Sequence, residues 1–228
     1  RESGFPWRVL AGEEEGALAF RGGTSWLAAS PSGASVGTAP LLLVDIGGGS
    51  TALAVGVAGE TPTFVCSLEI GVVRLTERFF RTDPPQPEAV TALAEHVAAA
   101  IAAGVPERLR LAVPAAVGVA GTFTTLVANK LGLTAYDASL VQGHVLSHAD
   151  IDQAVGRLAV LTSAERGRLP GIQPGREDVI LAGALIAREA LRAFGLEAVT
   201  VSESDLLEGV ALALADARWI LVAAAMAM

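Results

Sequence analysis

Cysteine, lysine and aromatic residues are scarce in this chain of 228 residues. Cys66 is the single cysteine, so no disulfide can form within the chain, and no group of cysteines and histidines has the spacing of a zinc site. A lone thiol is typical of proteins from a reducing compartment, and we expect a cytoplasmic protein. A packed core must therefore stabilise the fold, and the 52% of hydrophobic residues can supply one.

Basic charge and long apolar runs are also missing. The formal net charge of −8 excludes a broad nucleic-acid surface, which would need a basic face, although backbone amides can still bind a small anion. No basic stretch followed by an apolar core opens the sequence, so no signal peptide is expected. The C-terminal stretch RWILVAAAMAM is shorter than the roughly 20 residues that span a bilayer. We expect it to end a packed helix, and we expect no membrane role.

A linker divides the chain near its start. Residues 28–40 (AASPSGASVGTAP) are rich in serine, glycine, alanine and proline, which predicts a boundary near Pro40. Before it, WRVL has the pattern of a short strand, and the following segment, which includes Glu13, Glu14 and Glu15, has a helical composition. Three acidic residues in a row are most simply a solvated first helical turn.

After Pro40 the hydrophobic pattern changes several times between strand and helix. LLLVDIG is a continuous apolar run, typical of a strand buried on both faces, and two more strands follow it. Two further strands are expected within residues 108–121 and 197–204, and helices over residues 73–80, 88–103, 121–131 and 177–194 and after Ser202 or Ser204. Capping boxes predict two more helix starts, Ser147 with Asp150 and Thr162 with Glu165. This order predicts an α/β domain with a mixed five-stranded sheet and helices on both faces.

The stretch VDIGGGST places three glycines directly behind a buried strand. Residues 47–49 lack a Cβ, so their backbone can approach a ligand closely, and successive amides in such a turn can converge on an anion. Ser50 and Thr51 add hydroxyl groups. A plain hairpin turn would satisfy the same glycines, but Asp45 favours a ligand site, because a carboxylate at the end of a buried strand needs a metal, a water or a donor.

A second glycine-threonine element, VGVAGTFTTL, lies where a strand meets a helix. Gly121 and Thr122 would direct amides and a hydroxyl from a helix N-terminus, where anions are favoured. Taken alone, an ordinary helix cap is the simpler interpretation. Two such turns in one chain nevertheless predict that both line one cleft.

Five segments in order resemble the exopolyphosphatase and guanosine pentaphosphate phosphohydrolase (Ppx/GppA) family: VDIGGGST, SLEIGVVRLTERF, GVAGTFTTL, GREDVILAGALI and TVSESDLLEGV. The resemblance covers nearly the whole chain and implies the ribonuclease H-like fold of actin-like ATPases and sugar kinases. It also implies that residues 1–40 are the remnant of an N-terminal lobe with its linker, and that residues 41–228 form the second lobe. The first phosphate loop of the family would lie before Arg1.

The resemblance implies hydrolysis of a terminal phosphoanhydride bond of polyphosphate or of a guanosine polyphosphate, with Mg²⁺ or Mn²⁺ as cofactor. A homodimer is among the assemblies that it allows. Glu15 aligns with a carboxylate thought to activate water, and Asp45 with a second catalytic position and a metal ligand. The phosphate-binding positions would be Gly47, Gly48, Gly49, Ser50, Thr51, Gly121 and Thr122.

One position departs from the family pattern. Members commonly carry a glutamate directly after the GGGST segment, and this chain has Ala52, whose methyl group can neither ligate a metal nor accept a proton. Either Asp45 carries that role alone, or activity is low and the protein binds polyphosphate or guanosine polyphosphates without turnover. A sugar or acetate kinase of the same superfamily is the third hypothesis, disfavoured by SLEIGVVRLTERF and VSESDLLEG.

Overall fold

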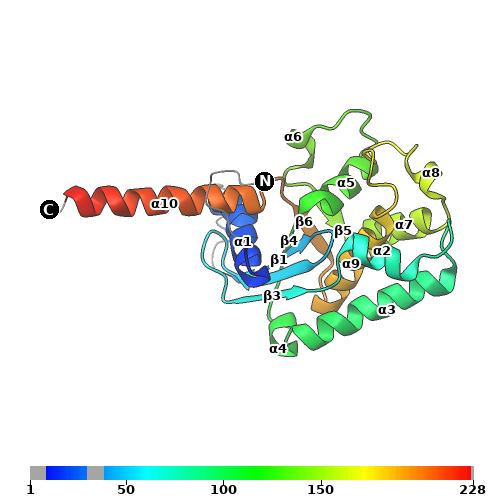
Figure 1. Cartoon of the computed structure of the whole chain (residues 1–228), viewed down its shortest axis with the longest axis horizontal. Helices are drawn as coiled ribbons and strands as arrows, with labels where there is room; N and C mark the ends of the chain where they lie inside the picture. Colours follow the sequence, from blue (N-terminus) through cyan, green and yellow to red (C-terminus); the bar gives the residue numbers. More distant parts are fainter. Residues whose placement is uncertain (1–8, 30–38, 227–228) are drawn as a thin grey trace.

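The computed structural model describes residues 9–29 and 39–226, with side-chain environments for residues 9–27 and 39–216 (Figure 1). The strand expected at WRVL is wrong for its described part, because residues 9 and 10 belong to no strand. The rest of that stretch lies outside the described residues. So do the side chains of the apolar C-terminal stretch, whose backbone is helical to Met226.

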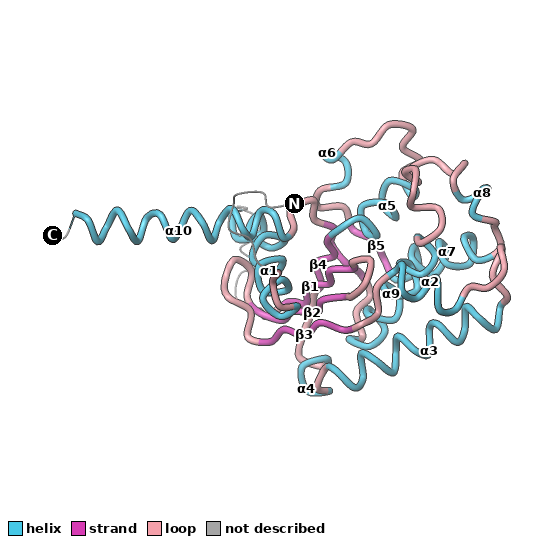
Figure 2. The backbone as a smooth tube through the Cα atoms, viewed as in Figure 1, coloured by secondary structure: helices cyan, strands magenta, loops and turns pink. Residues whose placement is uncertain are grey.

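A mixed sheet forms the centre of the domain (Figure 2). Its strands are β1 (Leu41–Ile46), β2 (Thr51–Gly56), β3 (Phe64–Leu68), β4 (Ala116–Val119), β5 (Val145–Ser147) and β6 (Ala198–Val201). Their order is β3-β2-β1-β4-β6-β5, with β4 and β6 parallel to the β1 direction and β2, β3 and β5 antiparallel to their neighbours. The mixed sheet is confirmed, but it has six strands instead of the predicted five. The short β5 was missed because three residues carry too little alternation to indicate a strand.

Strand β1 separates two apolar layers, as its continuous apolar run predicts. Leu42 and Val44 pack into the larger cluster, whereas Leu41 and Leu43 pack into a smaller cluster on the opposite face. All four side chains are buried. Since successive side chains of a strand point to opposite faces, only a strand covered on both sides needs apolar residues at every position.

Helices cover both faces of the sheet. On the smaller cluster lie α1 (Gly12–Ala29) and the start of α10 (Leu206–Met226), and the remainder of α10 extends away from the body (Figure 1). The larger cluster and its surroundings contain α2 (Val72–Phe79), α3 (Pro87–Gly104), α4 (Glu107–Arg110), α5 (Ala120–Lys130), α6 (Ala138–Val141), α7 (His148–Ala159), α8 (Ser163–Arg166) and α9 (Ile180–Phe194). The proposed boundary at Pro40 stays a prediction, and α1, which precedes it, packs directly on the sheet.

The predicted helix starts agree with the structure where capping chemistry defines them. Both capping boxes are formed, at Ser147 before α7 and at Thr162 before α8. The start of α9 is the exception, because the helix begins at Ile180, three residues after the predicted start. Gly171 and Gly175 adopt positive φ angles of 80° and 84°, which holds the preceding segment in turns.

Helices α1 and α10 contact each other through their backbones. A Cβ at Gly22 would lie 1.9 Å from the carbonyl oxygen of Asp205, and a Cβ at Gly209 would lie 1.9 Å from that of Leu18. No side chain fits at either position, so the two glycines set the distance between the helices. Because α1 begins near the sheet edge that carries Asp45, this distance also fixes where its first turn lies.

We expect Gly209→Ala to destabilise the protein by about 1–3 kcal/mol, because the added methyl group forces the two helices apart. Gly156→Ala is the matched control, since Gly156 lies in α7 with open space around its Cβ position. It should be neutral or stabilise the protein by up to about 1 kcal/mol. Urea unfolding of both variants measures the difference, and equal effects would contradict the proposed backbone contact.

Candidate functional site

Parallel pairing of β1 and β4 brings the two glycine-containing turns together. Asp45 lies opposite Val119 in this pair. Strand β1 ends one residue after Asp45, and β4 ends at Val119 itself. The β1–β2 turn and the start of α5 therefore lie at the same edge of the sheet. Ligands of open α/β sheets bind at such carboxyl ends of parallel strands. The strand register thus places both turns at one edge of the sheet, and their sharing of one cleft stays a prediction.

The carbonyl groups of the β1–β2 turn are held by the first turn of α2. The amides of Val72 and Val73 donate to the carbonyl oxygens of Gly47 and Gly48 at 2.9 and 3.0 Å. The Arg74 side chain donates through Nε to the Gly49 carbonyl at 3.0 Å. These bonds satisfy amides that a helix start leaves unpaired, and they occupy the turn carbonyls, which would otherwise repel an anion.

The amide groups of the same turn are available to a ligand. The Gly47 amide donates to the Ser50 carbonyl at 2.9 Å, which closes the turn. In the described part of the chain, the amides of Gly48, Gly49 and Ser50 have no protein acceptor. A run of free amides in a turn is the geometry that binds phosphate oxygens.

Gly71 is a site residue that the sequence reasoning missed. A Cβ there would lie 2.3 Å from the Gly48 carbonyl oxygen, so only glycine lets α2 approach the turn. The signal was a glycine directly before the helix that follows the third strand. Thr51 supports the same approach: its buried hydroxyl donates to the Ile70 carbonyl at 2.8 Å. Its predicted role in phosphate binding stays a prediction, and in the structure it holds the strand-to-helix connection.

Glu15 and Asp45 line one small cavity beside the turn. This cavity of about 30 Å³ also touches Gly47, Ser50 and Ala52, and it has room for a water molecule. Burial raises the pKa of Asp45 to about 6, with smaller contributions from the nearby carboxylates of Glu15 and Asp205. Two predicted catalytic carboxylates therefore meet in the structure.

Two glycines of α1 place Glu15 over the sheet edge. A Cβ at Gly12 would lie 2.6 Å from the Ser67 Cβ, and a Cβ at Gly16 would lie 2.7 Å from Val65 Cγ1. Residues four apart lie on the same face of a helix. This glycine face lets α1 lie close to β2 and β3, and its first turn carries Glu15 to the cavity.

At the start of α5, the two predicted phosphate-binding residues, Gly121 and Thr122, have different surroundings. Ala120 has a positive φ of 67°, uncommon for a residue with a side chain, and it turns the chain sharply from β4 into α5. Gly121 lies beneath Arg176, since a Cβ there would be 2.1 Å from Nη2. Thr122 is buried and packs against Gly183 of α9, where a Cβ would be 2.7 Å from its hydroxyl oxygen. Gly183 therefore permits close packing of α9 against α5.

Arg176 is the second residue that the sequence reasoning missed. It is half-buried, and no carboxylate of the described residues pairs with its guanidinium group. It lies in an irregular segment between α8 and α9, far in sequence from both turns. Its signal was weak, because an arginine in a glycine- and proline-containing segment usually belongs to a solvated loop.

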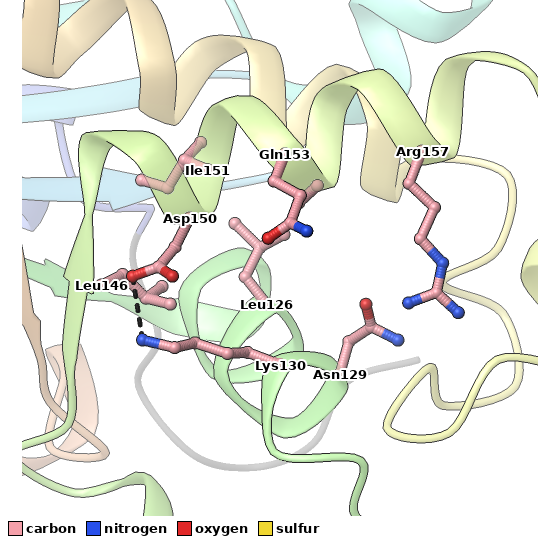
Figure 3. Close-up of a pocket in the computed structure, with 9 residues that line it drawn as sticks. Leu126, Asn129, Lys130, Leu146, Asp150, Ile151, Gln153 and Arg157 are labelled. Atoms are coloured by element: carbon pink, nitrogen blue, oxygen red, sulfur yellow. Dashed lines mark hydrogen bonds and ion pairs between the residues drawn. The ribbon is translucent and has the colours of Figure 1, made fainter.

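A different cavity lies between α5 and α7 (Figure 3). Lys130 donates to Asp150 there at 2.8 Å, and Gln153 and Arg157 line its far side. Burial opposes ionisation of Asp150, but the bonds from Lys130 and Ser147 dominate and lower its pKa to about 2. Since Lys130 lies at the opposite end of α5 from Gly121, and since the two cavities share no lining residue, this cavity is separate from the carboxylate site.

Comparison with known proteins gives consistent matches. The model of the Ppx/GppA phosphatase family matches residues 1–217. Exopolyphosphatase 2 of Mycobacterium tuberculosis is 37% identical over 219 residues, covering 91% of this chain and 63% of the relative. Exopolyphosphatase 1 of the same species is 32% identical, with coverages of 96% and 61%. The chain thus spans less than two thirds of the length of these curated relatives.

Solved structures agree with the fold. A crystal structure of the Ppx/GppA family member of Aquifex aeolicus matches with a TM-score of 0.82 and 32% identity, covering 95% of this chain and 67% of that one. An exopolyphosphatase from Cytophaga hutchinsonii matches with a TM-score of 0.75 and 25% identity, with coverages of 92% and 65%. These matches confirm the actin-like ATPase fold. None of the described helices has the length and apolar character needed to cross a membrane.

We expect Asp45→Asn to stabilise the protein at neutral pH. The raised pKa means that the native state holds a proton on Asp45 more tightly than the unfolded state does, with ordinary and native values of 3.8 and about 6. The tighter proton binding stabilises the native state of the parent protein fully below the ordinary pKa, and this stabilisation is lost as the pH rises through about 6. Above that pH, burial of the charged carboxylate lowers the free energy of unfolding by on the order of 2–3 kcal/mol.

Urea unfolding should therefore give the variant the higher stability at about pH 7.5, with the difference vanishing near about pH 4. Glu60→Gln, in the exposed β2–β3 connection, is the control carboxylate substitution. An Asp45→Asn protein no more stable than the parent at neutral pH would contradict the burial argument.

Proposed function

Because the chain belongs to the Ppx/GppA phosphatase family, we propose that the protein hydrolyses the terminal phosphoanhydride bond of inorganic polyphosphate and releases orthophosphate. The observation that carries this proposal is the meeting of Glu15 and Asp45 in one cavity beside a turn with free amides. The proposal concerns the complete protein, since the chain spans under two thirds of its curated relatives.

The terminal phosphate would bind between the two turns. The amides of Gly48, Gly49 and Ser50 donate to its oxygens from one side, and the start of α5 at Gly121 donates from the other. Arg176 lies against Gly121 and supplies positive charge to the same place. Phosphoryl transfer depends mainly on such positioning and on charge stabilisation around the equatorial oxygens.

Glu15 would activate the attacking water. In the step we propose, the water oxygen bonds to the terminal phosphorus, the bridging P–O bond breaks, and the shortened polyphosphate leaves with the bond electrons. The water proton passes to Glu15, which acts as general base. The cavity shared with Asp45 has room for this water.

We further propose Mg²⁺ or Mn²⁺ as the cofactor, with Asp45 as its ligand. The site offers the hard carboxylate oxygens that these ions prefer, and a cation would favour the ionised form of Asp45, whose pKa is raised mainly by burial and further by Glu15 and Asp205. The metal would neutralise charge on the phosphate oxygens. Within the described residues no three metal-binding side chains form a cluster, so substrate and water oxygens must complete the coordination, as is usual for Mg²⁺.

A second candidate function is binding of polyphosphate or guanosine polyphosphates without turnover. Ala52 favours it, because its methyl group lies in the cavity where the family pattern has a carboxylate. A guanosine pentaphosphate phosphohydrolase and a homodimeric assembly remain proposals that rest on family membership. A cytoplasmic location remains a proposal that rests on the single cysteine.

Glu15→Gln in the complete protein should lower orthophosphate release from polyphosphate by about 10²–10⁴-fold, the usual contribution of a general base. Glu13→Gln, an exposed residue of the same helical turn, is the matched control and should retain activity. Unchanged release by the Glu15 variant would overturn the assignment. Calorimetric binding of polyphosphate by the parent protein, with Mg²⁺ present and no release, would instead favour the second candidate function.

Arg176→Gln should lower kcat/KM for polyphosphate by about 10–100-fold, because it removes a charged donor at the proposed phosphate position. Arg168→Gln is the control, since Arg168 is an exposed arginine of the same connecting region. Equal kinetics for the two variants would remove Arg176 from the proposed site.

A further inference from the structure

Helix α2 and the residues directly after it carry three arginines, and the first of them lies at the β1–β2 turn. Arg74 donates through Nε to the Gly49 carbonyl at 3.0 Å. Arg78 lies one helical turn further along the same face, roughly 6 Å along the axis, since residues four apart on a helix are neighbours. Arg81 follows just beyond the end of the helix. Arg74 also pairs with Glu69 at 3.1 Å, but both side chains are exposed, so this pair contributes little and exchanges readily.

The second and third arginines are exposed and carry uncompensated charge. The guanidinium of Arg78 lies over the Phe79 ring, and its Nη1 is 3.3 Å from Nε2 of His96 on α3. Burial, and further the charge of Arg78, lower the pKa of His96. In the described part of the chain, neither Arg78 nor Arg81 forms an ion pair with a carboxylate, and Glu77 of the same helix pairs with neither of them. Both guanidinium groups are therefore accessible to an anion from solvent.

The other helices that begin near the turn are acidic at their starts. The first turn of α1 and the start of α10 carry five carboxylates: Glu13, Glu14, Glu15, Asp205 and Glu208. Arg176 contributes one positive charge on the far side, but Glu177 and Asp178 follow it directly. A long polyanion that left the site past α1 or α10 would be repelled, whereas the exposed face of α2 would attract it.

We propose that a polyphosphate chain whose terminal phosphate lies at the β1–β2 turn runs along the exposed face of α2, where Arg74, Arg78 and Arg81 bind its internal phosphates. This inference rests on the proposed function and adds to it a subsite for the part of the substrate that does not react. Every unit of the chain carries negative charge, and the planar fork of an arginine binds phosphate oxygens in pairs. The subsite favours long chains, because a chain of a few units ends before it reaches Arg78.

Orthophosphate release from long-chain polyphosphate and from tripolyphosphate, measured in the complete protein, tests the subsite. Arg78→Gln should raise KM for the long chain by about 3–10-fold and leave kcat unchanged, because it removes binding away from the reacting bond. The double variant with Arg81→Gln should raise this KM further, and KM for tripolyphosphate should stay constant. Arg157→Gln is the control and should change neither KM, since Arg157 is an exposed arginine of α7 that also lacks a carboxylate partner within the described residues.

A binding measurement separates this inference from the proposed hydrolysis. Calorimetric titration of the parent, Arg78→Gln and Arg157→Gln proteins with long-chain polyphosphate needs no turnover. Weaker binding by Arg78→Gln alone, in a protein that releases no orthophosphate, would support the subsite and contradict the hydrolysis. Release by the parent with equal KM values for the two variants would leave the hydrolysis intact and overturn the subsite. The subsite would also be overturned by an equal rise in KM for tripolyphosphate, by equal binding of the two variants, or by a parent protein that does not bind the long chain.

Discussion

The contact between the β1–β2 turn and the first turn of α2 determines the polarity of the whole candidate site. A glycine turn presents both amides and carbonyls, and these have opposite preferences for an anion. Here the amides of α2 take up the carbonyls of Gly47 and Gly48, so the remaining free groups of the turn are donors. The contact requires glycine at position 71, where a Cβ would collide with the Gly48 carbonyl. Without this approach, the same three glycines would form a hairpin turn with no preference for phosphate.

The position of the carboxylates depends on a second close approach, that of α1 to the sheet and to α10. Glycines on two faces of α1 make it possible: Gly12 and Gly16 lie against β2 and β3, and Gly22 against the start of α10. Because the backbone itself sets these distances, the first turn of α1 has little freedom to move. Glu15 is therefore held beside Asp45 by contacts that involve neither carboxylate, and its charge adds to the burial that raises the pKa of Asp45.

The sequence predicted the features that arise from local chemistry. The apolar run of β1, the two capping boxes and the glycine turn were all expected, and strand register explains why the two turns meet. The missed features arise from tertiary contacts between distant segments. Arg176 reaches Gly121 across more than 50 residues, and no local pattern marks it. Thr51 and Thr122 make tertiary contacts that their motifs did not predict: the Thr51 hydroxyl donates to the Ile70 carbonyl, and Thr122 packs against Gly183. Their role in phosphate binding stays a prediction.

The neighbours of Ala52 determine how an acidic side chain at this position would change the site. Ala52 lies opposite Asp45 in the β1–β2 pair, and a Cβ added at Gly16 of α1 would be 3.2 Å from the Cβ of Ala52. A longer acidic side chain at this position would have to extend into the cavity that Glu15 and Asp45 already share. There it would add a third negative charge and raise the pKa of Asp45 further unless a cation were held. With alanine, the two carboxylates face each other with less repulsion, so the site depends less on a metal for its stability. It also has fewer ligands with which to hold one.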